Sequence, residues 1–450
     1  MRLFFTFLFV AFTIITWLQS GNTSLSSLVL MFGVCLLCSN FIYKVRSLRD
    51  EFCTIYVFFY LFCSHTIVLV FPTFFNIGDQ YISRFWIFVH ILYVIFFATC
   101  LLFRHRKKSF QNDTEVQMEK VTKMQWNTLI VFMFSLSFIS FSLGLSKMGT
   151  AQDVYLPFHL AGIINYTRMS VIPVIYPFFL IRTYNNSPKR TFNKYLFVYF
   201  LWLLVETFVR LSRGVLVSSI IDLGIIFILV GTLKIKDLIR YALPIVLISV
   251  ALFPIVSALR SISGDNKLST NDLSKATKSE TQMDDTIRDS FLRMFSTVSF
   301  YDRIYTIIDK NSVFDFTRAP IILAMGGSHY YVTSEVDQRG LDEGHNSGST
   351  GIIDSLLFGG YGFCYIVFFL SVAAMTLLDT KKIINRPFIR YILFSLFIWF
   401  IRYRSVSYFL DSGVVVQLLV SGSLLYFFIV YYRRAPKKSV RSGAVNMLGV

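Results

Sequence analysis

The sequence predicts an all-α polytopic membrane protein with about twelve transmembrane helices and a large, partly helical loop outside the membrane. Three observations lead to this fold class. Of the 450 residues, 55% are hydrophobic and only 15% are charged, whereas soluble proteins average about 25% charged residues. The apolar residues come in long unbroken runs, as a hydrocarbon layer of about 30 Å requires. One long polar segment, residues 260–350, interrupts these runs late in the chain.

The apolar runs, taken in order along the chain, give twelve predicted spans. The first six cover residues 3–19, 25–43, 52–72, 85–103, 126–146 and 168–182. The second six cover residues 195–209, 215–233, 241–259, 358–379, 387–401 and 412–432. At about 1.5 Å per helical residue, each is long enough, or nearly so, to cross the hydrocarbon. The two shortest, 168–182 and 195–209, need interfacial residues to complete the crossing.

The cations are distributed unevenly between the two predicted sides of the membrane. If the N-terminus is cytoplasmic, 26 Lys and Arg residues fall on the inside connections and tails. Short outside connections carry only seven, namely Arg84, Lys147, Arg168, Arg210, Arg213, Arg402 and Arg404. This asymmetry follows the positive-inside rule and predicts that both termini are cytoplasmic. The formal net charge of +17 therefore reflects topology and does not indicate a nucleic-acid partner.

The chain is predicted to have four parts. These are transmembrane helices one to nine (1–259), a large outside loop (260–350), helices ten to twelve (351–434) and a basic cytoplasmic tail (435–450). Within the loop, residues 262–283 are polar and form a predicted flexible linker. Apolar residues at helical spacing predict an amphipathic helix on the membrane surface at 284–310. The loop holds ten cations and thirteen acids, so it does not suit nucleic acid.

Arginines on short outside connections are the first candidate binding residues, because topology does not require cations there. Arg210 and Arg213 lie between the seventh and eighth spans, and Arg402 and Arg404 lie at the outer end of the eleventh. Guanidinium groups bind phosphate oxygens bidentately, so two such pairs facing one pocket would hold a diphosphate. Snorkelling to lipid headgroups is the alternative. Glu206, one helical turn before Arg210, is predicted to pair with it and orient it.

The large loop supplies the candidates for a catalytic base. His345 follows a glycine, lies among hydroxyl and amide side chains, and precedes the re-entry of the chain into the membrane. A histidine there can accept a proton from a sugar hydroxyl at neutral pH. Asp342 and Glu343 compete for this role, and a loop histidine taken alone is more often structural.

No metal or cofactor is predicted. The sequence lacks a Cys/His ligand spacing, an Asp-x-Asp triplet that would hold Mg²⁺ on a nucleotide sugar, and a Walker phosphate-binding loop. The six cysteines all fall in or at the ends of predicted spans, so no disulfide framework follows. Nucleotide substrates are therefore not expected. The remaining possibility is a donor substrate that is carried by the membrane and reached from its outer side.

In its layout the chain resembles the O-antigen polymerase (oligosaccharide repeat unit polymerase) family of bacterial inner membranes, relatives of the O-antigen ligases. The resemblance rests on about twelve Phe-rich spans and on Arg210-x-x-Arg213-Gly214 between two mid-chain spans. It also rests on the late outside loop, which carries His345 before a glycine-rich span entry at Gly351, Gly359, Gly360 and Gly362. The resemblance covers the whole chain in layout but few residues in identity.

The resemblance implies a metal-independent glycosyltransferase of the GT-C type that works in the periplasm. Its donor would be a glycan on undecaprenyl diphosphate, and its acceptor the terminal sugar of a single undecaprenyl-diphosphate-linked repeat unit. The arginines would stabilise the departing lipid diphosphate while His345 or a nearby carboxylate deprotonates the acceptor, with inversion at the anomeric carbon. The implied partners are these lipid-linked oligosaccharides, the bilayer, a chain-length regulator and a flippase.

Two other functions remain open from the sequence. A flippase for the same lipid-linked sugar also has about twelve spans, but it would show two similar halves and short loops. Residues 1–230 and 231–450 show no such similarity to each other, and the outside loop is 91 residues long. An O-antigen ligase differs from the polymerase only in its acceptor.

Overall fold

A computed structural model describes most of the first half of the chain and parts of the second. The described ranges are residues 2–45, 50–72, 79–104, 121–145, 160–210, 223–229, 313–324, 351–380 and 389–394, with residues 47, 219, 248, 331, 383, 419–420 and 422–424. Within them the structure is helical and contains no strand. The helical part of the predicted fold class is thus confirmed for the described residues.

The helices follow the predicted runs closely in the first half of the chain. They are α1 (Arg2–Gln19), α2 (Leu25–Lys44), α3 (Phe52–Leu61), α4 (Ile67–Val70), α5 (Asp79–Arg104), α6 (Lys123–Ser142), α7 (Leu160–Tyr166), α8 (Ile172–Asn186), α9 (Lys189–Arg210), α15 (Ala319–Ala324) and α18 (Gly351–Leu378). The π-helical turn η1 (Phe62–Thr66) joins α3 to α4, and η3 (Thr167–Val171) joins α7 to α8. Each pair therefore forms one continuous helix with a wide turn inside it.

Six of the described helices are long and apolar enough to cross a membrane. The candidate spans are Arg2–Gln19, Leu25–Lys44, Tyr81–Phe103, Lys123–Ser142, Lys189–Arg210 and Ser355–Leu378. The chain is accordingly a helical membrane protein. The other predicted spans of the second half, and the loop segments 262–283 and 284–310, lie wholly or mostly outside the described residues.

Local sequence explains where several helices begin. The side chain of Ser24 accepts from the backbone N–H of Ser27 at the start of α2. At the start of α6, Thr122 and Gln125 form a reciprocal capping box. Ser187-Pro188 separates α8 from α9, because proline disfavours helix at the residue before it and suits the first turn of the next helix.

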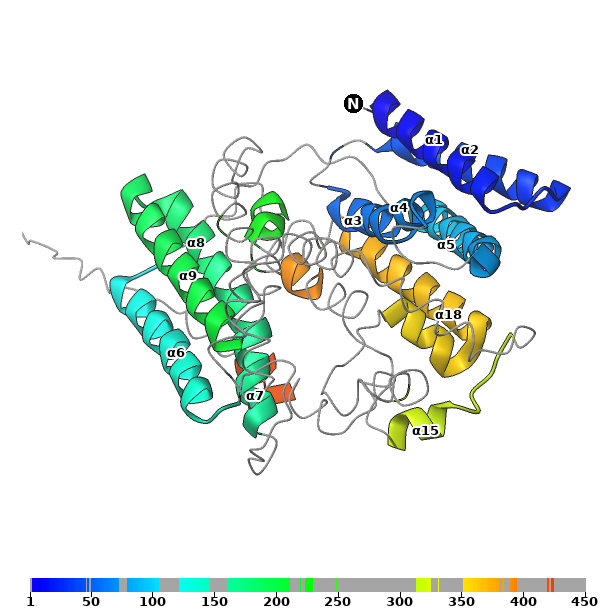
Figure 1. Cartoon of the computed structure of the whole chain (residues 1–450). Helices are drawn as coiled ribbons and strands as arrows, with labels where there is room; N and C mark the ends of the chain where they lie inside the picture. The colour runs from blue at the N-terminus through cyan, green and yellow to red at the C-terminus, as the bar shows by residue number, and fades with distance from the viewer. Residues whose placement is uncertain are drawn as a thin grey trace, which may run out of the picture.

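The first group of helices comprises α1 to α5 and α18 (Figure 1). Helix α5 packs against both α2 and α18, so it forms the centre of the group. Aromatic side chains fill these contacts: Phe9 meets Tyr93 edge to face at 5.2 Å between ring centroids, and Phe41 meets Phe96 in the same way at 5.3 Å. Part of the high Phe content is thus buried between helices.

The second group comprises α6, α7, α8 and α9 (Figure 1). Trp126 of α6 stacks on Tyr195 of α9 with ring centroids 3.9 Å apart, and its indole N–H donates to the Thr183 hydroxyl of α8 at 3.1 Å. The Tyr176 hydroxyl of α8 donates to the backbone carbonyl of Tyr195 at 2.9 Å. Trp126 and Tyr176 therefore each bury a ring and satisfy its polar atom at once.

Residues 389–394 contact both groups. Phe394 packs on Phe52 of α3, and Arg390 pairs with Asp379, which directly follows α18. On the other side, the Tyr391 hydroxyl lies 3.5 Å from the carbonyl oxygen of Pro173 in α8. That carbonyl lacks its usual helical donor because residue 177 is also proline, so the helix interior offers it to a side chain.

The helix around one predicted span is longer than expected, and this matters for the site. Residues 168–182 were expected to form a short span, with Arg168 on an outside connection. The structure instead has helix from Leu160 to Asn186, so Arg168 lies inside it at η3. The polar pair Thr167-Arg168 ended the apolar run in the sequence, but buried partners on neighbouring helices satisfy Arg168 and allow the helix to continue.

Candidate functional site: a buried arginine and glutamate cluster

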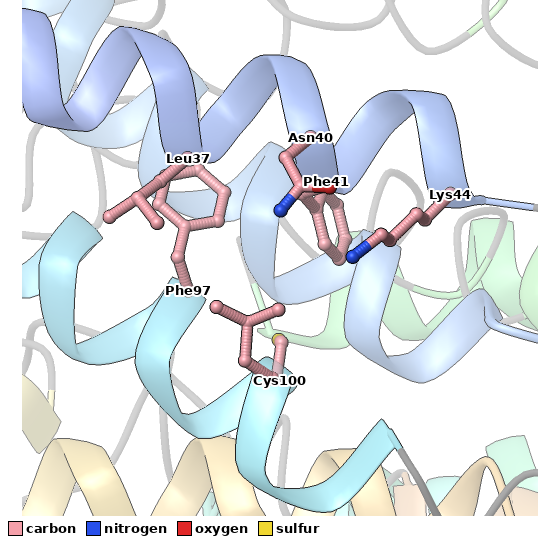
Figure 2. A pocket seen from close by; sticks show the side chains of 7 residues that line it. Leu37, Asn40, Phe41, Lys44, Phe97 and Cys100 are labelled. Atoms are coloured by element: carbon pink, nitrogen blue, oxygen red, sulfur yellow. The ribbon is translucent and has the colours of Figure 1, made fainter.

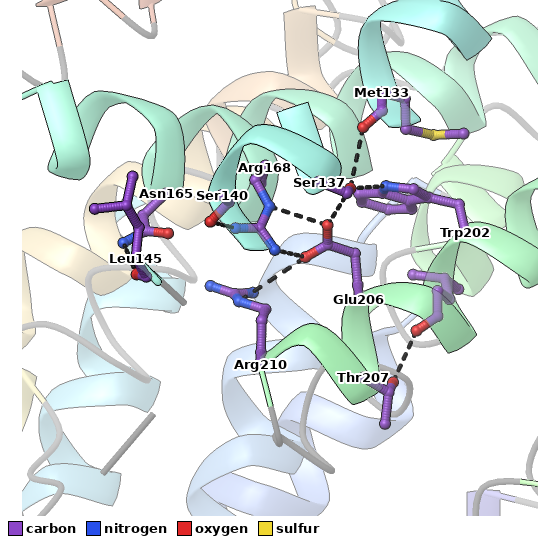
Figure 3. A network of polar contacts seen from close by, with 11 residues as sticks. Met133, Ser137, Ser140, Leu145, Asn165, Arg168, Trp202, Glu206, Thr207 and Arg210 are labelled. Atoms are coloured by element: carbon purple, nitrogen blue, oxygen red, sulfur yellow. Dashed lines mark hydrogen bonds and ion pairs between the residues drawn. The ribbon is translucent and has the colours of Figure 1, made fainter. Parts of the chain in front are cut away.

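The centre of the site is a bidentate ion pair between Arg168 of η3 and Glu206 of α9. The Nε of Arg168 donates to Oε1 of Glu206 at 2.9 Å, and one Nη donates to Oε2 at 2.6 Å (Figure 3). Neither side chain is exposed by more than 1%. A planar guanidinium that grips both carboxylate oxygens is the strongest pairing available to these groups.

Helix α6 supplies two hydroxyl groups to this pair. Ser140 accepts from the second Nη of Arg168, and Ser137 donates to Oε1 of Glu206. The Trp202 indole N–H donates to the Ser137 oxygen at 2.9 Å, which turns the hydroxyl proton toward its acceptors. The network therefore ties α6, η3 and α9 together and fixes the carboxylate in one orientation.

Arg210 is the second guanidinium of the cluster, one helical turn after Glu206. Its Nε lies 4.0 Å from Oε2 of Glu206, beyond hydrogen-bond distance, and its side chain is 6% exposed. Of the two arginines, Arg168 thus makes the short contacts to the carboxylate. Arg210 shares the same carboxylate only through a longer electrostatic contact.

The wide turn η3 accounts for the position of Arg168. A π-helical turn holds an extra residue relative to an α-helix, so the side chains before and after it are rotated against each other. Thr167–Val171 make this turn between two ordinary helices. Such turns often occur at functional sites.

The three charged side chains of the cluster carry a net charge of +1. Two guanidinium groups face one carboxylate, and all three are at least nine-tenths buried. A charge in a low-dielectric region is costly unless it is paired. Among the described residues, Arg210 has only the longer contact to a carboxylate that Arg168 already binds, and an anion beside Arg210 would be favoured.

The Asp379–Arg390 pair is the natural comparison, because it is also buried in this protein. The Asp379 carboxylate accepts from the backbone N–H groups of Cys53 and Thr54 at 3.2 and 2.9 Å and from one arginine. It thereby caps the N-terminus of α3, where acidic groups are favoured. With one arginine and one carboxylate this pair is electrically balanced, which indicates a structural role.

A small pocket lies elsewhere in the first group of helices. It lies between α2 and α5 and has about 210 Å³ of empty volume, and Figure 2 shows its lining. The lining residues are Leu37, Asn40, Phe41, Lys44, Phe97, Cys100 and Leu101. Because this volume also includes open solvent, the pocket is too small for a lipid-linked sugar.

The structure describes two of the residues that the sequence singled out for the site. It places Glu206 and Arg210 together in the cluster, with the i,i+4 contact at 4.0 Å. Arg213, Arg402, Arg404, Asp342, Glu343 and His345 lie outside the described residues. Within the described ranges, no group of three or more His, Cys, Asp or Glu side chains is arranged to hold a metal ion.

Arg168 is the site residue that sequence reasoning missed. It was counted among the seven outside cations but was not selected, because its neighbour in the fold, Glu206, is 38 residues away. An arginine with polar Asn165 and Thr167 before it, inside an otherwise apolar run, could have marked it. A buried arginine inside an apolar run is a functional candidate by default.

Comparisons with known proteins do not assign the chain to a family. No family model, no curated protein and no solved structure matches it. The class that the described residues establish is therefore that of a helical membrane protein with a buried, positively charged cluster.

Proposed function

We propose that the chain is an O-antigen polymerase: a glycosyltransferase that joins undecaprenyl-diphosphate-linked repeat units at the periplasmic face of the inner membrane. The observation that carries the proposal is the Arg168–Glu206–Arg210 cluster with its net positive charge. A diphosphate is the group on such a donor that guanidinium groups recognise.

The positive-inside rule supports the periplasmic side. With a cytoplasmic N-terminus, α9, which ends at Arg210, would run outward and bring Arg210 to the outer surface. Arg213 follows three residues later, and Arg402 and Arg404 fall on the same predicted side. Twelve spans with both termini in the cytoplasm and a GT-C-like arrangement belong to this proposal.

The proposed reaction is a direct displacement. The acceptor hydroxyl attacks the anomeric carbon of the donor sugar, and the bond from that carbon to the diphosphate oxygen breaks. The electron pair leaves with the lipid diphosphate, whose growing charge the arginines stabilise without a metal ion. The hydroxyl proton passes to His345, with Asp342 and Glu343 as the other candidates. One displacement inverts the anomeric configuration.

Complementation of a polymerase-deficient strain tests the proposal. The wild-type chain is expected to restore a ladder of O-antigen lengths on electrophoresis of lipopolysaccharide. Single substitutions Arg168→Ala, Arg210→Ala, Arg213→Ala and Arg402→Ala are expected to abolish the ladder while the protein remains in the membrane. Arg84→Ala is the matched control, because Arg84 is a cation of the same predicted side that lies on α5, away from the cluster.

The glycan pattern separates this proposal from its rivals. Lipopolysaccharide with a single repeat rejects the polymerase. Transfer of preformed polymer in a ligase-deficient strain assigns the ligase activity instead. Accumulation of lipid-linked units that face the cytoplasm indicates a flippase. Ladders of normal length from all four arginine variants would remove the cluster from the mechanism.

A further inference from the structure

A short segment before α15 is joined to a break in the candidate span at α18. The helix is interrupted at Gly360, whose φ of 78° and ψ of −176° lie in a region that is essentially restricted to glycine. The interruption makes backbone groups available to outside partners. The N–H of Asp315 donates to the carbonyl of Gly359 at 3.2 Å, and the N–H of Gly362 donates to the carbonyl of Val313 at 2.7 Å.

Two phenylalanine rings of the same segment pack into the space left by glycines. A Cβ on Gly359 would lie 2.6 Å from the ring of Phe316, and a Cβ on Gly362 would lie 2.6 Å from the ring of Phe314. Any larger residue at these two positions would push the rings away. The segment is thus held to α18 by two backbone hydrogen bonds and by two rings that need glycine beneath them.

The segment also exposes large apolar side chains, including those parts of the Phe314 and Phe316 rings that α18 does not cover. The exposed members are Val313, Phe314, Phe316, Ile321 and Leu323, at 61, 55, 45, 51 and 41%. Ala319 and Ile322 are buried, so α15 has one face toward the protein and one face away from it. Five exposed large apolar residues within twelve positions would be unfavourable in water.

The polar groups of the segment are satisfied locally. Asp315 accepts from the hydroxyl and backbone N–H of Thr317, and Arg318 donates to its other oxygen at 2.6 Å. These hydrogen bonds, Thr317 first, hold the pKa of the Asp315 carboxyl below its usual range. The carboxylate therefore stays ionised at neutral pH and remains paired with Arg318 of the same segment.

The attachment point lies below the start of the candidate span. Gly359 and Gly362 follow Ser355, the first residue of that span, by four and seven residues. Both positions therefore lie in the first third of that span, on either side of the break at Gly360. Interfacial helices bury their apolar faces about 5–10 Å below the headgroups, which is where the end of a membrane span also lies.

We infer that residues 313–324 are a membrane-inserted wedge, whose exposed apolar face contacts the acyl chains of the leaflet at the start of α18. The occupant of that face is lipid because the segment is fixed to a membrane span at a depth where lipid surrounds it. The large loop is then anchored to the bilayer near its middle as well as at its two ends. This inference does not depend on the proposed function.

Spin labelling of the full chain in vesicles tests the wedge. The six cysteines are first replaced by alanine, and single cysteines are introduced as Val313→Cys and Ile321→Cys. In vesicles of phosphatidylethanolamine and phosphatidylglycerol, both labels are expected to collide several-fold more often with oxygen than with a water-soluble nickel chelate. Leu370→Cys on α18, which is 58% exposed, is the lipid reference, and Thr317→Cys is the polar control within the segment.

Each outcome decides the question. Preferential collision of the Val313 and Ile321 labels with oxygen, similar to that at Leu370, supports the wedge. Preferential collision with the nickel chelate places the face in water and overturns it. Protection from both reagents means that protein covers the face and also overturns it. In a second variant, Gly362→Val should displace Phe314 and shift the Val313 label toward the chelate, and no shift would show that the ring contact does not hold the segment.

Discussion

Glu206 is the residue on which the whole cluster depends. It accepts two hydrogen bonds from Arg168, one from Ser137, and a longer electrostatic contact from Arg210. Removal of one partner from a buried ion pair typically costs about 3–5 kcal/mol, because the remaining charge is left uncompensated. Here two guanidinium groups would be left, so Glu206 both stabilises the fold and positions Arg168 and Arg210.

We expect Glu206→Gln to show whether positioning of the arginines by the Glu206 charge is needed for activity, separately from its contribution to fold stability. The amide keeps the size of the side chain, but it removes the negative charge and brings N–H groups toward a guanidinium. Activity should fall by about 100-fold, since a misplacement of catalytic groups by about 1 Å can cost that much. The measurement is polymerisation of a lipid-linked repeat unit by purified protein, normalised to the folded fraction.

Asp379→Asn is the matched control for Glu206→Gln. It removes the same charge from another buried arginine pair, away from the cluster. Its thermal unfolding temperature should fall, whereas the activity of the folded fraction should stay near that of the wild type. Equal losses of activity in both variants would mean that the cluster is only a structural ion pair.

At the scale of helices, the described chain uses two kinds of interruption. In η1 and η3 the helix continues through a wide turn, whereas in α18 it breaks at Gly360 and a separate segment binds the released backbone groups. Backbone groups at membrane depth must be satisfied by protein, because lipid offers no hydrogen bonds. The pairing with Val313 and Asp315 meets this requirement at the break.

Substitution of the glycines around the break by alanine should lower stability, whereas substitution of a glycine in regular helix should not. Gly360→Ala forces a non-glycine residue into a strained conformation, which costs about 1–3 kcal/mol. Gly362→Ala overpacks the Phe314 ring at a similar cost. Gly33→Ala in α2 is the control: a Cβ there meets nothing within 4 Å, and alanine favours helix by roughly 0.5–1 kcal/mol. Thermal unfolding in detergent measures all three, and equal midpoints would contradict the role of the break.

The helices show what the sequence could and could not predict. Residues 25–43 were predicted as a span and form α2, because an apolar run in a membrane has helix as its natural outcome. The contact of Glu206 with Arg210 follows from helical spacing and was also predictable. The contact of Arg168 with Glu206 joins two helices through an irregular turn, and neither local periodicity nor charge counting contains that information.

At the scale of the whole molecule, a buried arginine–carboxylate contact lies in each of the two groups of helices among the described residues. Residues 389–394 connect them through Arg390, Tyr391 and Phe394. The cluster at Arg168 lies near the end of α9, and the Asp379 pair lies at the start of α3. Under the predicted topology these two pairs are on opposite sides of the membrane.

Labelling with a membrane-impermeant maleimide tests this sidedness. In the background without cysteine, Thr23→Cys lies between α1 and α2, and Ser187→Cys lies between α8 and α9. Reagent added to intact spheroplasts is expected to label residue 23 and not residue 187, because the cations flanking residue 187 mark the cytoplasmic side. After permeabilisation both should react. Labelling of residue 187 alone in intact spheroplasts would reverse the topology and remove the cluster from the periplasmic side.

The wide turn at Thr167–Val171 affects how the sequence of a relative would align with this chain. One additional residue in a helix rotates the residues before it by about 100° relative to the residues after it. A relative with an unbroken helix here would align only with a single-residue gap inside the segment, and its equivalent of Arg168 would point away from Glu206. A relative that lacks this one residue would therefore not be able to form the cluster. A relative that aligns here without a gap would be able to form it.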